Sequence, residues 1–446
     1  DIAKSVLISA LLQNDYKRVV QTRSDFEKMY LYVDDNERIT ESQLKGEERK
    51  KITPMKGAGF FTDGSYVLHT LHAMNATYGP AHFEPLCMFE KIFSGTAFET
   101  NTPFKYNVPE VFYNVFNSVI YGTTTYRMVM GRTEPVNNFN NGTGLIAAAF
   151  SAADKFDPED RDKIYGILKA SLIANPNAGY TGKLCLEDIK KYKEVIADDS
   201  IKPIEDISEN RVFYNMDKVV HKRNDWSVGI SMSSSRIFNY ECINNQNMKG
   251  WYLGDGRTEW YLYGDNINAT SGYWSSIDPY RYPGTTVDTQ ERQAVSIDQG
   301  YEYLSSKDYV GGVSLGGKYG VAAMELESFH NDTESSESSA HGKTLPAHTS
   351  DLVAKKSYFM FDDEFVALGA GVNAKNNNDA EVLTIVDNLL SNETASKSGR
   401  AIVEPYKILS AVASATPEPE NVAANTIDDD MGSKWAGKLD GELVFD

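Results

Sequence analysis

A histidine and a tyrosine, His69 and Tyr78, lie nine positions apart beside a glycine-containing turn. An imidazole and a phenol can each accept or donate a proton, so the pair suits general acid–base chemistry. An unperturbed phenol titrates near ~10, and a nearby cation is needed before its phenolate becomes accessible at lower pH. Taken alone, such a pair is more often structural than catalytic, because most polar side chains simply satisfy local hydrogen bonds.

Three motifs in the chain are more specific than this pair. The first contains the pair itself and reads Asp63-Gly64-Ser65-Tyr66, His69 and Tyr78-Gly79. The second lies in the carboxyl-terminal half and comprises Ser234-Ser235-Arg236, Asn239-Tyr240-Glu241, Asn244, Asn247, Gly250-Trp251-Tyr252, Gly272-Tyr273-Trp274 and Asp278-Pro279-Tyr280-Arg281-Tyr282-Pro283-Gly284-Thr285-Thr286. The third reads Lys355-Lys356-Ser357-Tyr358-Phe359-Met360-Phe361-Asp362-Asp363.

These motifs together resemble polysaccharide lyase family 8, which includes hyaluronate, chondroitin AC and xanthan lyases. The resemblance extends over roughly residues 1–390. It implies an α+β multidomain fold, with an N-terminal incomplete α/α toroid followed by antiparallel β-sandwich sheets and a substrate cleft between them. It also implies a lyase that cleaves a uronic-acid-containing polysaccharide, such as hyaluronan or chondroitin, by β-elimination and gives unsaturated oligosaccharides.

This reaction explains why the family needs these residue types. The C5 proton of a uronic acid is weakly acidic, so the neighbouring carboxylate must first be neutralised or hydrogen-bonded. A base then takes the proton, and an acid donates one to the leaving oxygen. The resemblance implies catalytic roles for four residues: Tyr78 transfers protons, Arg132 is the cation beside it, His69 accepts a proton or orients the carboxylate, and Glu241 supports the arginine. The sequence leaves open whether His69 or Tyr78 is the base.

Three further residues are candidates for binding the substrate. The resemblance implies that Asn244 contacts the sugar from the β side. Trp251 and Trp274 lie in the second motif, and indole rings can stack on the C–H faces of sugars. A place in the buried core is the alternative for both tryptophans.

The chain departs from the family pattern at two places, which keeps other functions open. Val136 stands where the family usually has a second arginine, four positions after Arg132, so a xanthan-type lyase is an alternative. By our alignment, the family's carboxylate-neutralising asparagine and its aromatic platform fall just upstream of Asp1. A catalytically incomplete carbohydrate-binding protein of the same fold is therefore the second alternative. A glycoside hydrolase would need paired carboxylates across the cleft, and nothing around Asp63 or Glu241 indicates such a pair.

The elements that must position these residues follow from hydrophobic periodicity. Helical patterns run through residues 1–200, with an apolar face predicted for Ile2, Val6, Leu7, Ala10 and Leu11, a helix from Pro109 to Gly122 and a third helix opening at Asp157-Pro158. From about Val212 the pattern alternates as in β-strands, and residues 358–368 read as a hairpin. We predict three units: a toroid at 1–200 that is truncated at its N-terminus, a β-sandwich at 201–407 and a partial discoidin-like carbohydrate-binding segment at 408–446. The stretch from Glu37 to Lys56 reads as a solvated loop.

Composition limits the classes of partner. The 446 residues carry a formal net charge of -19 and no evident basic patch, which disfavours nucleic acid. No run reaches transmembrane length, and three cysteines make no disulfide framework. His72 follows His69 by three positions without carboxylate or cysteine at ligand spacing, so packing is favoured over a metal site. We expect no cofactor, no metal, no membrane association, a monomer, and a secreted bacterial protein.

Overall fold

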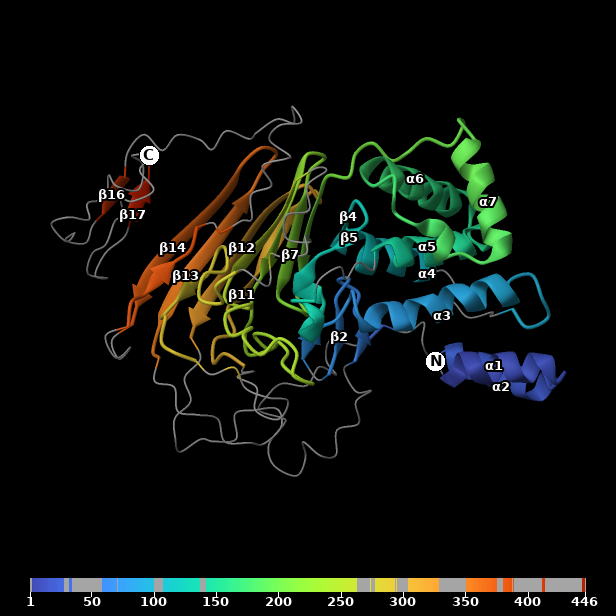
Figure 1. The fold of residues 1–446 in the computed structure, drawn as a ribbon, viewed down its shortest axis with the longest axis horizontal. Helices are drawn as coiled ribbons and strands as arrows, with labels where there is room; N and C mark the ends of the chain where they lie inside the picture. Colours follow the sequence, from blue (N-terminus) through green and yellow to red (C-terminus); the bar gives the residue numbers. More distant parts are fainter. Residues whose placement is uncertain are drawn as a thin grey trace, which may run out of the picture.

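The computed structural model describes residues 2–27, 32–33, 58–69, 71–99, 107–136, 142–262, 273, 277–292, 294, 304–328, 350–374, 380–386, 388, 411–413 and 443–445. Helices come first along the chain and antiparallel sheets follow, as Figure 1 shows. The predicted α+β order, helical part before β-sandwich, is confirmed. Within the described ranges, no helix has both the length and the apolar character needed to cross a membrane.

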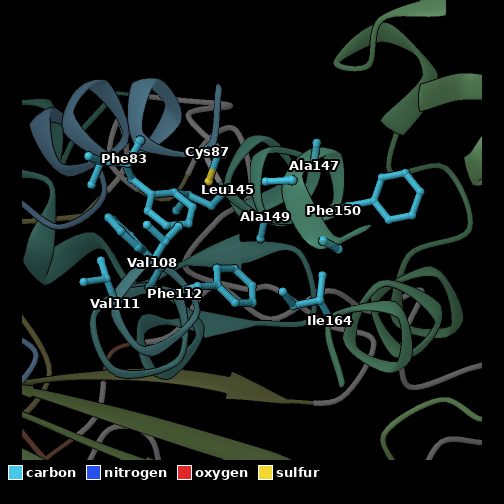
Figure 2. Packing of buried hydrophobic residues seen from close by; sticks show 14 of the residues in the cluster. Phe83, Cys87, Val108, Val111, Phe112, Leu145, Ala147, Ala149, Phe150 and Ile164 are labelled. Atoms are coloured by element: carbon cyan, nitrogen blue, oxygen red, sulfur yellow. The ribbon is translucent and has the colours of Figure 1, made fainter. Parts of the chain in front are cut away.

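The helical part is built around one hydrophobic core (Figure 2). Its helices are α1 (Ile2–Leu12), α2 (Tyr16–Glu27), α3 (Tyr78–Phe93), α4 (Asn107–Val111), α5 (Gly142–Ala152), α6 (Pro158–Ala174) and α7 (Leu186–Ala197). Phe83 of α3 and Leu145 of α5 are fully buried in this core, as is Phe112, which follows α4. Packing α3 against α5 fixes the helix whose first residue is Tyr78.

The helix predicted from Pro109 has the expected buried stripe but a different backbone. The α-helix α4 ends at Val111, a π-helical turn covers Phe112–Phe116, and a 3-10 turn covers Asn117–Val119. The predicted helix at Pro158 is confirmed as α6, with Asp157 at its N-cap position. The predicted apolar face of α1 is wrong in part, because Leu7 and Ala10 are buried whereas Ile2 and Leu11 are exposed.

Short strands connect the helical part to the sheets. Strands β1 (Gly59–Phe60), β2 (Tyr66–Leu68) and β3 (His72–Ala73) form an antiparallel meander. A two-stranded ribbon of β4 (Ile120–Tyr121) and β5 (Thr124–Thr125) follows η5 and η6, the π-helical and 3-10 turns after α4. Of the candidate site residues, His69 directly follows β2, and Arg132 lies in the segment after β5.

The first large sheet has the order β6-β7-β8-β9 and is buried on both faces. Its strands are β6 (Glu209–Phe213), β7 (Lys218–Lys222), β8 (Trp226–Ser231) and β9 (Arg257–Leu262). One face packs on residues 119–130 of the helical part. Gly229 permits this approach, because a Cβ there would lie 2.8 Å from atoms of Tyr126 and Met128.

The second large sheet has the order β11-β12-β13-β14. Its strands are β11 (Val310–Leu315), β12 (Tyr319–Glu327), β13 (Val353–Met360) and β14 (Phe365–Asn373). The predicted hairpin at residues 358–368 is confirmed by antiparallel pairing of β13 with β14, Met360 opposite Phe365. Ile230 of β8 and Tyr358 of β13 share the cluster between the two sheets, so the sheets pack face to face.

Two small pairs complete the described fold: β10 (Thr286–Val287) with β15 (Leu383–Thr384), and β16 (Ala411–Ala413) with β17 (Leu443–Phe445). The predicted loop from Glu37 to Lys56 and most of the discoidin-like segment lie outside the described residues. An extended segment joins the end of α7 at Ala197 to the start of β6 at Glu209. The molecule is therefore layered, with helices, a sheet buried on both faces, and an outer sheet (Figure 1).

Candidate active site

His69 directly follows strand β2 and adopts an unusual backbone conformation. Its φ of 48° lies in the left-handed region, which is uncommon for residues other than glycine. His72 on β3 holds this turn, since its Nδ1 lies 2.8 Å from the His69 carbonyl and must donate to it. Burial lowers the pKa of His72, which favours the neutral ring, and the ring stacks on Phe238. His72 therefore has the predicted packing role. No cluster of three or more potential metal-binding side chains occurs in the described part of the chain.

Tyr78 is the first residue of α3, and a buried asparagine fixes the turn before it. The Asn75 side chain accepts a hydrogen bond from the Tyr66 amide at 3.1 Å and donates to the carbonyls of Gly64 and Val115 at 3.0 Å each. It thus ties the β1–β2 meander to the π-helical turn. The sequence analysis did not identify Asn75, because a single buried amide leaves no periodic signal.

Arg132 lies in a 3-10 turn, Gly131–Thr133, whose conformation depends on its glycine. Gly131 has a φ of 54°, and a Cβ there would lie 2.5 Å from Glu241 Oε2 and 2.6 Å from Met74. A side chain cannot approach that closely. Glycine therefore lets the Arg132 backbone amide donate to Glu241 Oε2 at 2.7 Å.

Glu241 is the hub of the site, although only 3 % of it is exposed. Its Oε1 lies 2.7 Å from His69 Nδ1 and 3.2 Å from Arg132 Nη1. Burial alone would raise the pKa of Glu241, but the hydrogen bonds from His69 and Arg132 and the nearby His72 lower it to about 2. The carboxylate is therefore ionised at neutral pH.

The guanidinium of Arg132 distributes its donors among three partners. Nη2 donates to the Tyr78 hydroxyl at 3.0 Å, Nη1 to Glu241, and Nε to Gln246 Oε1 at 3.1 Å. Burial lowers the pKa of Arg132, but bonding to Tyr78 and Glu241 outweighs this and raises it. Arg132 is thus a permanent cation in contact with the phenol oxygen.

His69 and Tyr78 face each other at the open side of this cluster. Their ring centroids are 4.7 Å apart at an angle of 65°. Because Nδ1 of His69 faces an ionised carboxylate, that nitrogen carries a hydrogen, and the other ring nitrogen of the neutral ring is a proton acceptor. His69 is 37 % exposed at its side chain and Tyr78 is partly buried, so both are accessible to a ligand from solvent.

A buried network beneath the site fixes the loop that carries Arg132. Glu259 on β9 accepts the backbone amides of Arg127 and Met128 at 2.7 and 3.1 Å. Arg127, itself buried, donates from Nη1 to the carbonyls of Glu134 at 2.5 Å and Val136 at 2.9 Å. Residues 127–136 are thereby clamped to the first large sheet. Val136 takes part through its backbone, which accepts from Arg127 and donates to the Thr133 carbonyl at 2.9 Å.

A tight turn on the β side presents the remaining candidates. Ile243 and Gln246 pair across Asn244 and Asn245, whose φ values of 59° and 58° fit a type I′ turn. Asn244 is exposed at the tip of this turn. Gln246 is a further site residue that the motifs did not reveal, although the Asn244-Asn245 pair is a signal for the turn that brings its side chain to Arg132.

The tryptophan that the structure describes, Trp251, differs from what a sugar platform requires. Trp251 is only 3 % exposed and packs among Tyr240, Tyr252 and Tyr282, so its ring faces are covered by protein. Trp251 is therefore a residue of the buried core, which was the alternative to stacking on a sugar, and the stacking role is not supported. Trp274 lies outside the described residues.

Two large cavities lie away from this cluster. One, of about 1040 Å³, runs along α6 and α7, and several of its charged lining residues form ion pairs, such as Lys91 with Asp188 and Lys191 with Asp154. The other, of about 930 Å³, lies beneath the segment that joins α7 to β6. The chemistry-bearing side chains meet instead at the junction of the helical part and the sheets.

Two domain families match the chain. The polysaccharide lyase family 8 N-terminal alpha-helical domain matches residues 48–170, and the polysaccharide lyase family 8 super-sandwich domain matches residues 208–417. The first match covers α3, α4, α5 and most of α6 in the helical part, and the second covers both large sheets. All four predicted catalytic residues lie within these two matches.

Individual relatives agree with the domain matches. The chain is 31% identical to a hyaluronate lyase of Thermasporomyces composti over 71% of its length and 38% of the relative's. It is 31% identical to a xanthan lyase of Bacillus sp. strain GL1, over 74% of this chain and 33% of that protein. A solved structure of Paenibacillus xanthan lyase superposes with a TM-score of 0.70 at 28% identity, covering 87% of this chain and 33% of that one. The chain thus spans about a third of the length of these relatives.

Proposed function

Since the chain belongs to polysaccharide lyase family 8, we propose that it forms part of an enzyme that cleaves an acidic, uronic-acid-containing polysaccharide by β-elimination. The observation that carries this proposal is the contact of a fixed guanidinium with a phenol oxygen, 3.0 Å from Arg132 Nη2 to Tyr78. A cation at that position stabilises the phenolate form that proton abstraction requires. The His69 ring beside the phenol adds a second proton acceptor.

The geometry supports a defined sequence of proton transfers. Tyr78 takes the C5 proton, the C5–H electron pair forms the C4–C5 double bond, and the C4–O bond breaks. The phenol then returns its proton to the leaving oxygen, so that no water is consumed. Glu241 fixes the positions of His69 and Arg132 relative to each other through hydrogen bonds to both. His69 and Asn244 are exposed polar groups from the two sides of the site that can contact the sugar and its carboxylate.

Product analysis tests the proposal directly. The full-length protein is incubated with hyaluronan, chondroitin and xanthan, and the far-ultraviolet absorbance of the new C4–C5 double bond is followed together with reducing ends. A lyase generates both signals in equal molar amounts. New reducing ends without that absorbance on any of the three polymers would show hydrolysis and refute the elimination mechanism.

The choice of polymer is the second part of the proposal. Two relatives of equal identity to this chain are named hyaluronate lyase and xanthan lyase. Because position 136 is a valine and not an arginine, xanthan is kept among the candidate substrates. A catalytically incomplete carbohydrate-binding protein is the remaining alternative. Polymer binding without turnover, unchanged in Tyr78→Phe, would favour it over the lyase.

We propose the remaining organisation from the sequence alone: catalytic toroid residues in 1–200, a sandwich in 201–407, and a discoidin-like segment from 408 to 446. Retention of the full-length protein on immobilised polysaccharide, with and without Trp435→Ala, tests the last of these. We also propose a secreted monomer. Size-exclusion chromatography with light scattering and activity in the culture medium test the two statements.

A further inference from the structure

The side chain of Gln246 occupies the third position around the Arg132 guanidinium. Its Oε1 accepts a hydrogen bond from Arg132 Nε at 3.1 Å. The other two arms of the guanidinium go to Tyr78 and Glu241. All three arms are therefore held, and a planar guanidinium with three fixed partners has one orientation relative to the phenol oxygen.

The orientation of the Gln246 amide follows from its partner. Arg132 Nε carries a hydrogen and can only donate, so the amide oxygen must face it and the NH2 group must point elsewhere. The backbone supports this arrangement, because the Gln246 amide donates to the Ile243 carbonyl at 3.1 Å and closes the turn. Gln246 thus binds the cation without bringing a charge.

That lack of charge matters because few charged groups face Arg132. From the sheet side the only carboxylate in hydrogen-bond contact among the described residues is Glu241. From the helical side the groups are Tyr78 and, through Glu241, the two imidazoles of His69 and His72. One carboxylate thus balances one guanidinium. A second carboxylate at position 246 would give the cluster a net negative charge at the place where a polyanion and a phenolate must be accommodated.

We propose that Gln246 is a positioning residue that orients Arg132 toward Tyr78 while leaving the guanidinium charge available to the phenolate and to an acidic substrate. The proposal rests on the lyase function proposed above. It goes beyond that function in assigning a specific role to a side chain outside the catalytic four.

Two nearly isosteric variants separate the positioning role from the charge role. Gln246→Glu keeps an acceptor for Arg132 and adds a negative charge, whereas Gln246→Met removes the acceptor and adds none. For Gln246→Glu we expect the rising limb of the kcat/KM profile to move to higher pH by about 1 pH unit, and KM for the polyanion to rise about 5-fold. Both effects follow because an added negative charge a few ångströms away destabilises the phenolate and the bound polyanion. For Gln246→Met we expect kcat to fall about 10-fold, with KM within about 2-fold and the pH profile unmoved.

The matched control is Gln13→Glu, which adds the same charge at an exposed position directly after α1. Its pH profile and KM should equal those of the parent protein. Thermal unfolding of each variant excludes loss of folding as the cause. If Gln246→Glu superposes on the parent in pH profile and KM, the charge role is refuted. If both variants lose the same fraction of kcat with unmoved profiles, Gln246 has only a structural role and the proposal fails.

A measurement without turnover separates this inference from the proposed function. The absorbance of the Tyr78 phenolate is obtained during an alkaline titration as the difference between each protein and its Tyr78→Phe counterpart. In Gln246→Glu this signal should appear at higher pH than in the parent. Such a shift in a protein that releases no unsaturated product would refute the lyase function but keep the role of Gln246; an unshifted signal would refute that role.

Discussion

Glu241 is the side chain through which the helical and sheet parts share one site. It accepts from a ring nitrogen, a guanidinium and a backbone amide, so His69 and Arg132 are both fixed relative to one carboxylate. Charge-assisted hydrogen bonds of this kind are stronger than neutral ones. Loss of the carboxylate would leave the partly buried guanidinium of Arg132 without one of its partners, which costs more than the bond itself contributes.

Tyr78→Phe removes only the phenol oxygen and should lower kcat by about 10² to 10⁴-fold, the range typical for a lost proton-transfer group. KM should change little, since the ring and its packing remain. Initial rates of double-bond absorbance and polymer binding measure the two effects. Tyr16→Phe, at an exposed tyrosine of α2, is the control and should match the parent. Retention of a tenth or more of kcat in Tyr78→Phe would remove the phenol from the mechanism.

Glu241 also makes stability depend on acid. Its pKa is about 2 in the folded protein and 4.5 in its ordinary state, so its contribution is complete above pH 4.5 and is lost as pH falls toward 2. We therefore expect the free energy of unfolding in urea to fall less between pH 5 and pH 3 for Glu241→Gln than for the parent, whatever the difference in stability between the two proteins at pH 7. Glu205→Gln, on the exposed connecting segment, should retain the acid dependence of the parent. Equal losses for parent and Glu241→Gln would contradict the prediction.

At the scale of elements, the site depends on turns rather than on helices or strands. His69, Gly131 and Asn244 all have positive φ values, and each is in a turn that ends or joins regular elements. Backbone conformations of this kind persist only where the surrounding structure imposes them. The turn that carries Arg132 is held in its conformation by a buried network of Glu259, Arg127 and the carbonyl of Glu134.

Gly131→Ala tests the dependence on one such turn. The new Cβ would collide with Glu241 Oε2 and with Met74, and the left-handed backbone itself costs about 1–2 kcal/mol for alanine. We expect kcat to fall more than 100-fold because Arg132 must move from the phenol. Gly182→Ala is the matched control, since a Cβ there meets nothing within 4 Å. An active Gly131→Ala protein would mean that the turn does not determine the position of Arg132.

At the scale of the whole molecule, the first large sheet joins the site to the outer sheet. One of its faces packs under the Arg132 loop and the other packs on β12 and β13. His221 of β7 extends this connection, because its Nε2 lies 2.7 Å from the Phe361 carbonyl in the β13–β14 turn. Burial, together with nearby Arg223, lowers the pKa of His221 from 6.5 to about 4.

This histidine predicts a loss of stability below neutral pH. The unfolded chain binds a proton at His221 near pH 6.5 whereas the folded chain resists it down to about 4, so folding stability is complete above 6.5 and declines as pH falls to 4. At pH 5 the loss from this residue is about 2 kcal/mol. Between pH 7.5 and pH 5, the free energy of unfolding in urea should fall less for His221→Gln than for the parent, and the difference should equal that amount. An identical decline in both proteins would assign the effect to other groups.

Much of the fold was open to prediction because local patterns determine it. Pro158 before an amphipathic run marks α6, and the Asp362-Asp363-Glu364 turn between apolar runs marks the β13–β14 hairpin. The helix from Pro109 was one exception, beside the partly wrong apolar face of α1. Its buried stripe was correctly read, but packing against α5 and the short strands decided that the backbone would pass through π and 3-10 turns.

The sequence by itself determined which side chains could transfer protons and which motifs accompany them, because residue types and local spacing are written in the chain. The packing of the chain brought Glu241, 172 positions after His69, to 2.7 Å from its ring, and it made Gln246 the third side-chain partner of Arg132. It also decided that Trp251 is a core residue. Contacts of such separation follow from how the helical part and the sheet pack, which no local pattern encodes.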